Sequence, residues 1–448
     1  MSGDRVRIEL PPKVKIIINK LLENGYEAYA VGGCVRDSVL GRIPDDWDIT
    51  TSATPEEVKE IFFRTIDTGI AHGTVTVMLE REGFEVTTYR IDGEYEDGRH
   101  PKSVSFTRSL VEDLKRRDFT VNAMAYNDVS GIVDEFGGIE DLKRGIIRCV
   151  GNAEDRFRED ALRILRAVRF SAQLGFQIEE KTRQAVQKLA ANLEHISAER
   201  IQVELVKLLV SKNPDRLLMA YETGITKVIL PEFDKMMECP QNNPHHLYNV
   251  GEHTIKAVEQ IENSKALRLA MLFHDVAKPD TRTTDEKGVD HFYGHPDFSV
   301  EIARQILKRL RFDNDTMNKV CLLIKYHDTD IDSRKKAVRR AMNKVGEDSF
   351  LELLKVKRAD TMAQSEYKRA EKLLNIETVE KLYHEILQDK ECVSLKTLAV
   401  TGQDLIDNGI KPGKQMGVIL NTLLLDVIEE PKHNNYPYLI SKAIKMKE

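Results

Sequence analysis

Two aspartates, Asp46 and Asp48, begin the segment DWDITT shortly after a glycine pair, Gly32 and Gly33. In an extended strand, residues two apart lie on the same face, so both carboxylates would point the same way. Carboxylates at this spacing can jointly hold divalent cations such as Mg²⁺. The glycines follow the apolar run 26–31, where bare backbone N–H groups at a helix start suit a triphosphate. The segment predicts a metal-dependent nucleotidyl-transfer site in which the two aspartates are catalytic.

A second group of chemically capable residues lies in the other half of the chain, where seven of the twelve histidines fall between His245 and His327. Imidazoles and carboxylates borne on helices are good ligands for Mn²⁺, Ni²⁺, Co²⁺ or Zn²⁺. The metal ligands predicted from this pattern are His253, His274, Asp275, His295, His327 and Asp360. The histidines interpreted as ordinary polar residues are His245, His246, His291 and His384.

Charged residues repeat every third position in REDALRILRAVRF, which spans 158–170. On a helix this spacing would set Asp160, Arg163, Arg166 and Arg169 along one slowly turning ridge. A carboxylate accepts from the exocyclic amine of cytosine or adenine and a guanidinium donates to the adjacent ring acceptor, whereas guanine and uracil present the reverse pattern. The ridge could meet a base at one end and a triphosphate at the other. The alternative is a set of salt bridges on a solvated helix.

The elements that must position these residues differ between the two parts of the chain. Before about residue 150, apolar and β-branched runs predict strands at 26–31, 46–50, 75–80, 84–90 and 147–150. After about residue 153 the periodicity is helical. The fold class predicted is α+β, with a mixed-sheet head followed by an all-α neck, body and tail. The expected boundaries are 1–150 for the head, 151–215 for the neck, 216–370 for the body and 371–448 for the tail.

Composition limits the compartment and the partners. The 448 residues carry a net charge of −6 with 31% charged residues, so a nucleic-acid site must be a local basic patch. The five cysteines lack metal-site or redox spacing, which predicts free thiols in a reducing compartment. No run approaches the roughly 20 apolar residues that a membrane span needs. The chain is expected to be cytoplasmic and to use no membrane.

The segment VGGCVRDSVLGRIPDDWDIT resembles the active-site motif of the polymerase-beta-like superfamily, in the form found in class II tRNA nucleotidyltransferases and poly(A) polymerases. Similarity to the CCA-adding tRNA nucleotidyltransferases implies a polymerase-beta-like head with Mg²⁺ as its cofactor. It implies addition of C, C and A to the 3′ end of tRNA, from CTP and ATP, without a nucleic-acid template. The residues implied to bind the nucleotide are Gly32, Gly33, Arg36, Arg117, Asp118, Asp160, Arg163, Arg166 and Arg169.

Individual motifs give these residues roles within the resemblance. The segment RRDFTVNAM resembles the motif that contacts phosphate and ribose, which implies Arg117 on phosphate and Asp118 on the sugar hydroxyls. The EDxxR segment resembles the family's protein template, which implies that Asp160 and Arg163 choose the base. On the neighbouring predicted strand, Glu85 is a candidate third metal carboxylate.

Other segments extend the resemblance without adding chemistry. The polar, turn-rich segment 90–101 resembles the flexible loop that lets the site switch from CTP to ATP. Segments 134–142 and 197–205 resemble the family's hinge and its helix-stabilising neck motif. Segment 400–417 resembles its C-terminal element, which implies a tRNA-binding tail; the alternative there is a helix-turn-helix packing unit.

The adjacent pair His274-Asp275 resembles the motif of the HD phosphohydrolase superfamily. That resemblance implies a mononuclear or binuclear metal site that activates water against a phosphoester or a cyclic phosphate. Four alternatives to full CCA addition remain: an A-adding enzyme with a CC-adding partner, a poly(A) polymerase, an HD phosphohydrolase whose head binds tRNA, and a non-catalytic RNA-binding protein. The segment 71–77 lacks the arginine pair of poly(A) polymerases, which disfavours the second.

Overall fold

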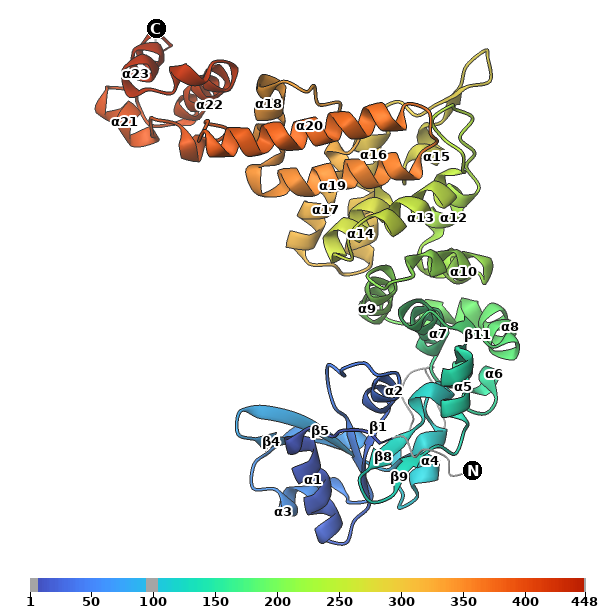
Figure 1. Ribbon diagram of the computed structural model, residues 1–448. Coiled ribbons are helices and arrows are strands. Elements are labelled where there is room, and N and C mark those ends of the chain that lie inside the picture. Colours follow the sequence, from blue (N-terminus) through green and yellow to red (C-terminus); the bar gives the residue numbers. More distant parts are fainter. Residues whose placement is uncertain (1–6, 94–103, 447–448) are drawn as a thin grey trace. The chain divides into compact units, whose positions relative to one another are not determined.

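The computed structural model describes residues 7–93 and 104–446. The chain forms two compact units, Met1–Pro231 and Glu232–Glu448, and Figure 1 shows that the first contains the sheet and the second is almost entirely helical. This agrees with the predicted α+β class. The predicted flexible loop at 90–101 falls mainly on residues 94–103, outside the described part of the chain.

A seven-stranded sheet forms the head, with strand order β3-β4-β5-β2-β1-β8-β9. β2 and β5 are parallel, whereas the other neighbouring pairs are antiparallel, so the sheet is mixed as predicted. Its strands are β1 (Ala28–Val31), β2 (Ile49–Thr51), β3 (Thr65–Gly69), β4 (Thr74–Leu79), β5 (Glu82–Thr88), β8 (Ala125–Asn127) and β9 (Gly131–Val133). A separate two-stranded sheet pairs β6 (Arg90–Asp92) with β7 (Val104–Phe106).

Five short helices connect and cover the strands of the head (Figure 1). They are α1 (Pro12–Glu23), α2 (Gly33–Val39), α3 (Pro55–Ile61), α4 (Leu110–Lys115) and α5 (Gly138–Arg144). A capping box starts α3: the Thr54 hydroxyl accepts from the Glu57 backbone N–H, and the Glu57 carboxylate accepts from the Thr54 N–H. At the predicted hinge, the Asp134 carboxylate accepts from the backbone N–H groups of Gly138 and Ile139 and so caps α5.

Two predicted strands have different bounds in the structure. β2 begins only at Ile49, so Asp46 and Asp48 lie in the loop that leads into it and not within a strand. The Asp48 carbonyl still accepts a bond from the Val31 N–H at 3.0 Å, which holds this residue at the end of the sheet. Instead of a strand over 147–150, β10 (Ile146–Ile147) pairs in parallel with β11 (Gln177–Ile178).

The rest of the first unit is helical: α6 (Ala153–Glu159), α7 (Leu162–Leu174), α8 (Glu180–Leu189), α9 (Ala198–Leu209), α10 (Leu217–Glu222) and α11 (Ile225–Ile229). The continuous helix predicted through 158–170 is wrong at one point, because the chain leaves helical conformation at Asp160 (φ −140°, ψ 102°). The Asp160 carboxylate accepts from the Leu162 N–H at 3.1 Å. This side-chain acceptor competes with the helix for backbone donors and separates α6 from α7.

The second unit is built from α12 (Pro231–Met237), α13 (Val250–Gln260), α14 (Lys265–Phe273), α15 (Lys278–Thr281), α16 (His295–Arg309), α17 (Asn314–Tyr326), α18 (Lys335–Val345), α19 (Glu347–Ala363), α20 (Arg369–Gln388), α21 (Gly402–Asp407), α22 (Lys414–Glu429) and α23 (Tyr436–Lys445). The expectation of an all-helical remainder misses β11 and a small hairpin, β12 (Thr283–Thr284) with β13 (Asp290–His291). The last three helices enclose a core of their own around Leu405, Leu423 and Leu439.

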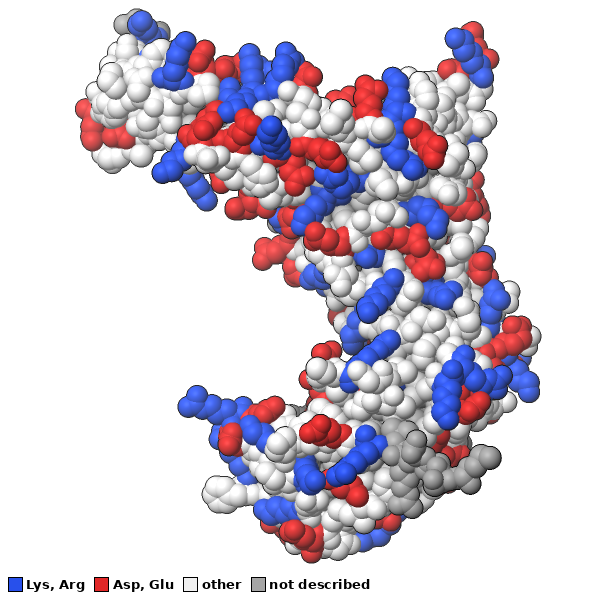
Figure 2. Space-filling view, viewed as in Figure 1, with Lys and Arg blue, Asp and Glu red and all other residues white. Residues whose placement is uncertain are grey.

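Bulk features of the sequence also have structural counterparts. All five cysteines are free and buried, as predicted. No helix in the described part of the chain is long and apolar enough to cross a membrane. On the face shown in Figure 2, basic and acidic side chains are intermixed over both units, which fits the small net charge.

Candidate active site and metal centre

A sharp turn between β1 and α2 places a guanidinium over the glycine pair. Gly32 has φ +83°, a conformation that favours glycine. A Cβ added there would lie 2.9 Å from Nη1 of Arg117, so Gly32 also leaves room for this side chain. Arg117 in turn lies 3.7 Å from the buried Asp113 carboxylate. The structure therefore brings the predicted phosphate-binding arginine directly to the predicted triphosphate turn.

Three carboxylates meet beside this turn. Asp46 and Asp48 are exposed in the loop before β2, and the pairing of Ile49 with Val86 sets Glu85 of β5 next to Asp48. Desolvation and the negative charges of Asp46 and Glu85 raise the pKa of the Asp48 carboxyl, while Arg117 opposes the shift. Accessible oxygens with unbalanced negative charge fit a divalent cation.

Buried polar contacts connect α2 with the neck helix α7. Arg36 donates to the Asn122 amide oxygen at 2.6 Å, and the Asn122 NH₂ group donates to Asp118 at 3.1 Å. Arg166 donates through Nε and Nη2 to the other Asp118 oxygen, at 2.8 and 2.6 Å. Burial opposes the Asp118 charge, but Arg166 outweighs it and lowers the pKa of this carboxyl. Asp118 thus positions Arg36 and Arg166, and both of its oxygens are occupied by protein donors.

An aromatic ring and a glutamate organise the arginines of α7. The Phe170 ring has three guanidinium carbons near its centroid, that of Arg169 at 3.5 Å and those of Arg36 and Arg166 at 5.2 Å. Glu204 of α9 accepts from Arg169 at 2.7 Å and lies 3.6 Å from Arg166. Arg169, a predicted triphosphate ligand, is therefore buried within the neck, and the predicted supporting role of the 197–205 motif has a physical basis in Glu204.

The predicted base-choosing pair lies at the break between α6 and α7. Arg200 donates to Asp160 at 2.7 Å. Arg163 donates to Glu159 at 2.8 Å and to the Arg116 carbonyl at 2.8 Å. The structure thus holds each member of the pair by partners from other elements, and the polar ridge on α7 consists of the three arginines alone.

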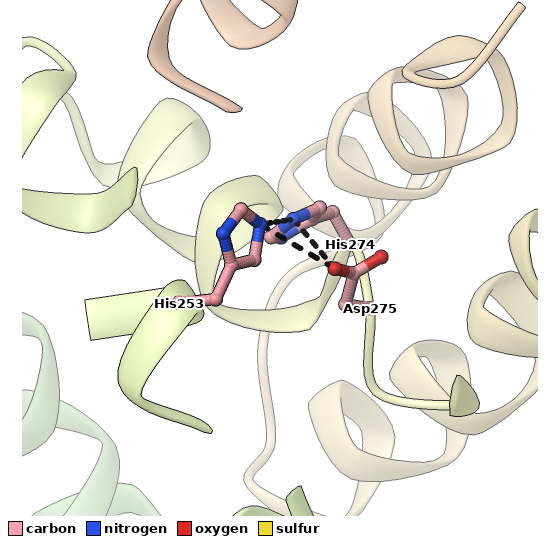
Figure 3. Close-up of side chains that lie close together, drawn as sticks. All are labelled: His253, His274 and Asp275. Atoms are coloured by element: carbon pink, nitrogen blue, oxygen red, sulfur yellow. Dashed lines mark hydrogen bonds and ion pairs between the residues drawn. The ribbon is translucent and has the colours of Figure 1, made fainter. Parts of the chain in front are cut away.

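The second predicted metal site is assembled in full from five elements of the helical unit. His253 lies on α13, His274 and Asp275 follow α14, His295 begins α16, His327 ends α17, and Asp360 lies on α19. Two sets can each converge on one ion, His253 with His274 and Asp275, and Asp275 with His295 and His327; within each set the ligand atoms lie within 4.8 Å of one another. Figure 3 shows the first set, with both imidazoles directed at the Asp275 carboxylate.

The carboxylate of Asp275 bridges the two sets. One oxygen lies 3.2 Å from Nε2 of His274, and the other lies 3.2 Å from Nε2 of His295. On the outer side of the first set, Asp360 lies 2.9 Å from Nε2 of His253. One carboxylate between two imidazole groups is an arrangement that can hold two divalent ions.

The tautomers of three of these histidines are fixed by the backbone. His274, His295 and His327 each donate from Nδ1 to the carbonyl three residues earlier, at 2.7, 2.9 and 2.7 Å. A carbonyl only accepts, so Nδ1 carries the proton and each Nε2 can present a lone pair to the cluster. Burial opposes protonation of His274, but Asp275 and Asp360 outweigh it and raise its pKa to about 10. The donor set fits a divalent cation.

A cavity of about 340 Å³ opens onto the cluster, and its lining includes Asp275, His295, His327 and Asp360. Lys278 lines the same cavity, with its ammonium 2.7 Å from the Asp275 carboxylate. A buried cluster of histidines and aspartates beside a cavity with a cationic wall could admit a phosphoester.

Several residues of both sites escaped the sequence analysis. Asp113 and Lys278 had a usable signal, because they stand four residues before Arg117 and three after Asp275, spacings that bring side chains together on a helical turn. Phe170 had none, since its contacts with three arginines depend on how α2 and α7 pack. His246 and His291, interpreted as ordinary polar residues, line the cavity beside the cluster.

Three family models match the chain. The poly(A) polymerase head domain matches residues 28–148, a probable RNA- and SrmB-binding site of polymerase A matches 175–237, and a putative domain 2 of tRNA nucleotidyltransferases matches 292–443. The curated CCA-adding enzyme of Ligilactobacillus salivarius is 36% identical over 445 residues, which is 96% of each chain. That of Pediococcus pentosaceus is 34% identical over 97% of this chain and 98% of its own.

Solved structures show the same similarity. The crystal structure of the Bacillus stearothermophilus CCA-adding enzyme in complex with CTP has a TM-score of 0.73 and 31% identity, and the match covers 98% of both chains. The Thermotoga maritima CCA-adding enzyme, solved with tRNA, has a TM-score of 0.57 and 22% identity over 98% of this chain and 97% of its own, a likeness of fold.

Proposed function

The chain belongs to the CCA-adding enzymes, the class II family of tRNA nucleotidyltransferases, and from this we propose how its residues share the reaction. The enzyme adds C, C and A to the 3′ end of tRNA and uses CTP and ATP as substrates. The carboxylate group of Asp46, Asp48 and Glu85, beside Arg117 and Gly32, carries the assignment of the active site.

In the proposed site, Asp46 and Asp48 hold Mg²⁺, and Glu85 adds negative charge from β5. The ion supplies Lewis acidity at the α-phosphate and lowers the pKa of the attacking hydroxyl. The 3′ oxygen of the tRNA forms a bond to the α-phosphorus, the bond between that phosphorus and pyrophosphate breaks, and the hydroxyl proton passes to solvent water. Arg117 binds the triphosphate, with Gly32 leaving its guanidinium room. Arg36 and Arg166 line the same site. Asp118 holds Arg166 directly, and it holds Arg36 through the Asn122 side chain.

Base choice is assigned to Asp160 and Arg163 at the start of α7. Guanine or uracil bound there would set a carbonyl against the Asp160 carboxylate and a ring N–H against the Arg163 guanidinium, at a cost of roughly 1–3 kcal/mol per wrong pair on the scale of base readout. Binding of a base requires Arg163 to exchange its bonds to Glu159 and the Arg116 carbonyl for bonds to the nucleotide. We therefore propose that nucleotide binding changes the hydrogen-bond partners of Asp160 and Arg163.

Arg163→Ala tests the base-choice assignment. We expect extension of a tRNA transcript ending in CC to lose its preference for ATP over GTP and UTP by roughly 5- to 150-fold, the equivalent of one wrong pair. Arg158→Ala, an exposed arginine of α6 that pairs with Glu154 and Asp155, is the control and keeps the preference. Unchanged selectivity in Arg163→Ala would refute the template assignment.

We further propose a metal-dependent phosphohydrolase site in the helical unit. Its support is the bridging position of Asp275 between two sets of histidines. In three of them, His274, His295 and His327, a backbone carbonyl accepts from Nδ1, so Nε2 is the atom directed at the cluster. Ions held there, of the type Mn²⁺, Ni²⁺, Co²⁺ or Zn²⁺, would supply an activated water. In the reaction a water oxygen bonds to phosphorus, the P–O ester bond breaks, and the leaving oxygen takes a proton.

Metal content tests this second function independently of turnover. We expect the purified protein to retain close to two divalent ions after dialysis against Mn²⁺ and removal of free metal, as measured by mass spectrometry of the elements. It should release nitrophenol from bis(p-nitrophenyl) phosphate. Absence of bound metal would refute the proposal.

The division into head 1–150, neck 151–215, body 216–370 and a tRNA-binding tail 371–448 is proposed on the motifs alone.

A further inference from the structure

A fully buried carboxylate lies on α4, next to the arginine that faces the glycine turn. Asp113 has 0% of its surface exposed. Burying a carboxylate is unfavourable unless charged or hydrogen-bonding groups surround it. The groups around Asp113 therefore indicate its role.

The partners of Asp113 come from three elements of the head. Arg116, which ends α4, donates from Nε and Nη2 to Oδ1 at 3.0 and 2.8 Å. The backbone N–H of Arg90 in β6 donates to the same oxygen at 3.4 Å. The other oxygen, Oδ2, accepts from the Thr50 hydroxyl of β2 at 3.2 Å. The orientation of the carboxylate is thus fixed before a nucleotide binds.

The Oδ2 atom of Asp113 also faces the guanidinium of Arg117. Nη2 of Arg117 lies 3.7 Å from this oxygen, an ion pair without a direct hydrogen bond. Nε of Arg117 is buried and lacks a hydrogen-bond partner among residues 7–93 and 104–446. Burial lowers the pKa of Arg117, and the negative charge of Asp113 is the largest effect that opposes this shift. Asp113 therefore favours the charged guanidinium and leaves a donor of Arg117 for another anion.

The same oxygen connects the arginine with the carboxylate loop. Thr50 follows Asp48 by two residues, so their Cα atoms lie about 7 Å apart at most. Because Thr50 and Arg117 share Oδ2, Asp113 sets the position of the arginine relative to Asp46 and Asp48. A triphosphate must reach both, since its α-phosphate meets the ion while a cation binds its outer phosphates.

We infer that Asp113 is a positioning residue of the nucleotidyl-transfer site, which holds Arg117 at the distance from the Asp46–Asp48 loop that a nucleoside triphosphate spans. The inference rests on the proposed binding of the triphosphate by Arg117, to which it adds the residue that orients this arginine. Asp113 itself does not contact the nucleotide, because it is fully buried and both of its oxygens accept from protein donors.

Equilibrium binding of CTP and CMP tests the inference, because the two differ only in the β- and γ-phosphates. Binding is measured by calorimetry with Mg²⁺ and without tRNA, so that no transfer occurs. Asp113→Asn removes the charge and keeps the shape, and we expect the affinity for CTP to fall roughly tenfold while that for CMP stays the same. Glu112→Gln is the control, since Glu112 pairs with the exposed Lys115, and it should change neither affinity.

A double-mutant cycle separates action through Arg117 from a general structural effect. Arg117→Ala should lower the affinity for CTP roughly tenfold or more, and adding Asp113→Asn should then lower it no further. Equal losses for CTP and CMP in Asp113→Asn would overturn the inference. Losses that add in the double variant would overturn it as well, because Asp113 would then act independently of Arg117.

Thr50→Val decides the matter if Asp113→Asn fails to fold. It removes one donor to Oδ2 and keeps both arginines opposite a carboxylate, so the buried charges stay balanced. We expect a fall of roughly two- to fivefold in the affinity for CTP, with that for CMP unchanged. An unchanged affinity for CTP in this variant would then overturn the inference.

The outcomes separate the inference from the function on which it rests. If Arg117→Ala leaves the affinity for CTP unchanged, the proposed binding of the triphosphate by Arg117 fails, and the role of Asp113 fails with it. If Arg117→Ala weakens binding of CTP and a folded Asp113→Asn does not, the role of Asp113 alone is refuted.

Discussion

The two clusters of candidate metal ligands in this chain are built in opposite ways. In the head, Asp46 and Asp48 are exposed, lie in a loop at the end of a sheet, and face Arg117 across a glycine turn. In the helical unit, His253, His274 and Asp275 are all buried, and the backbone orients their neighbours. The first arrangement suits an ion that arrives with its triphosphate, whereas the second suits an ion that stays.

The contrast also shows in electrostatics. At the head, desolvation and neighbouring carboxylates raise the pKa of Asp48, so negative charge is in excess until a cation binds. In the helical unit, His274 and Lys278 beside Asp275 hold the pKa of that carboxyl well below its usual range. In the helical site the positive charges of His274 and Lys278 thus balance the negative charge of Asp275. Binding of a metal ion there would release protons.

The largest effect is expected from Asp48→Asn in the head. Removing one of two charged metal ligands costs several kcal/mol of transition-state stabilisation, which corresponds to a fall of about 10³-fold or more in nucleotide transfer. The measurement is extension of a tRNA transcript that lacks CCA, supplied with CTP and ATP. Asp45→Asn, an exposed neighbour, is the control. Metal bound in the helical unit should not change, and substantial transfer by Asp48→Asn would show that the ion is held elsewhere.

Asp275→Asn should produce the reverse pattern. Loss of the bridging charge separates the two histidine sets, so we expect less than one divalent ion to remain per chain and hydrolysis of bis(p-nitrophenyl) phosphate to fall to background. Addition of CCA to tRNA should continue at the normal rate. Asp280→Asn, exposed on α15, should keep both metal and hydrolysis. A parallel loss of CCA addition would mean that the two sites are not independent.

A third prediction concerns a buried ion pair that stabilises the first unit and takes no part in the reaction. Glu204→Gln leaves the guanidinium of Arg169 buried without its partner, as both side chains are about 5% exposed. The expected loss in free energy of unfolding is about 3 kcal/mol, measured by urea denaturation. Glu222→Gln breaks the exposed pair with Arg183 and should cost at most about 1 kcal/mol. Equal losses would contradict the buried network.

The sequence was sufficient for features set by local pattern. The strand before the carboxylate loop and the six predicted ligands in the helical unit, which the structure brings together, follow from residue type and spacing. These six residues were recoverable because each candidate ligand must be a histidine or an aspartate, and few of these lie in apolar helices.

Features set by packing were not recoverable. The periodicity of REDALRILRAVRF continues through Asp160, and the helix breaks there because the carboxylate binds the Leu162 N–H and Arg200, which is distant in sequence. The cation–π cluster on Phe170, which includes Arg36 of α2, likewise arises only when separate elements meet. A charge repeat predicts a polar face, but it does not reveal whether that face is solvated or, as with Arg169, buried.

The smallest effect tests the glycine turn itself, through Gly32→Ala. Both Gly32 and Gly25 have positive φ, at 83° and 85°, so alanine at either position should cost about 1 kcal/mol in stability. At Gly32 the new Cβ would also lie 2.9 Å from Nη1 of Arg117, whereas at Gly25 nothing lies within 4 Å. Only Gly32→Ala should displace the guanidinium.

Displacement of Arg117 weakens one charge-assisted bond to the triphosphate, for which we expect a roughly tenfold rise in KM for CTP and ATP. Gly25→Ala should also lower stability in urea denaturation but leave KM unchanged, because it places alanine at a positive φ and lacks the contact. Metal retained by the helical unit should be equal in both. If the two variants have the same KM, the glycine turn acts only through backbone conformation and the position of Arg117 is not what it secures.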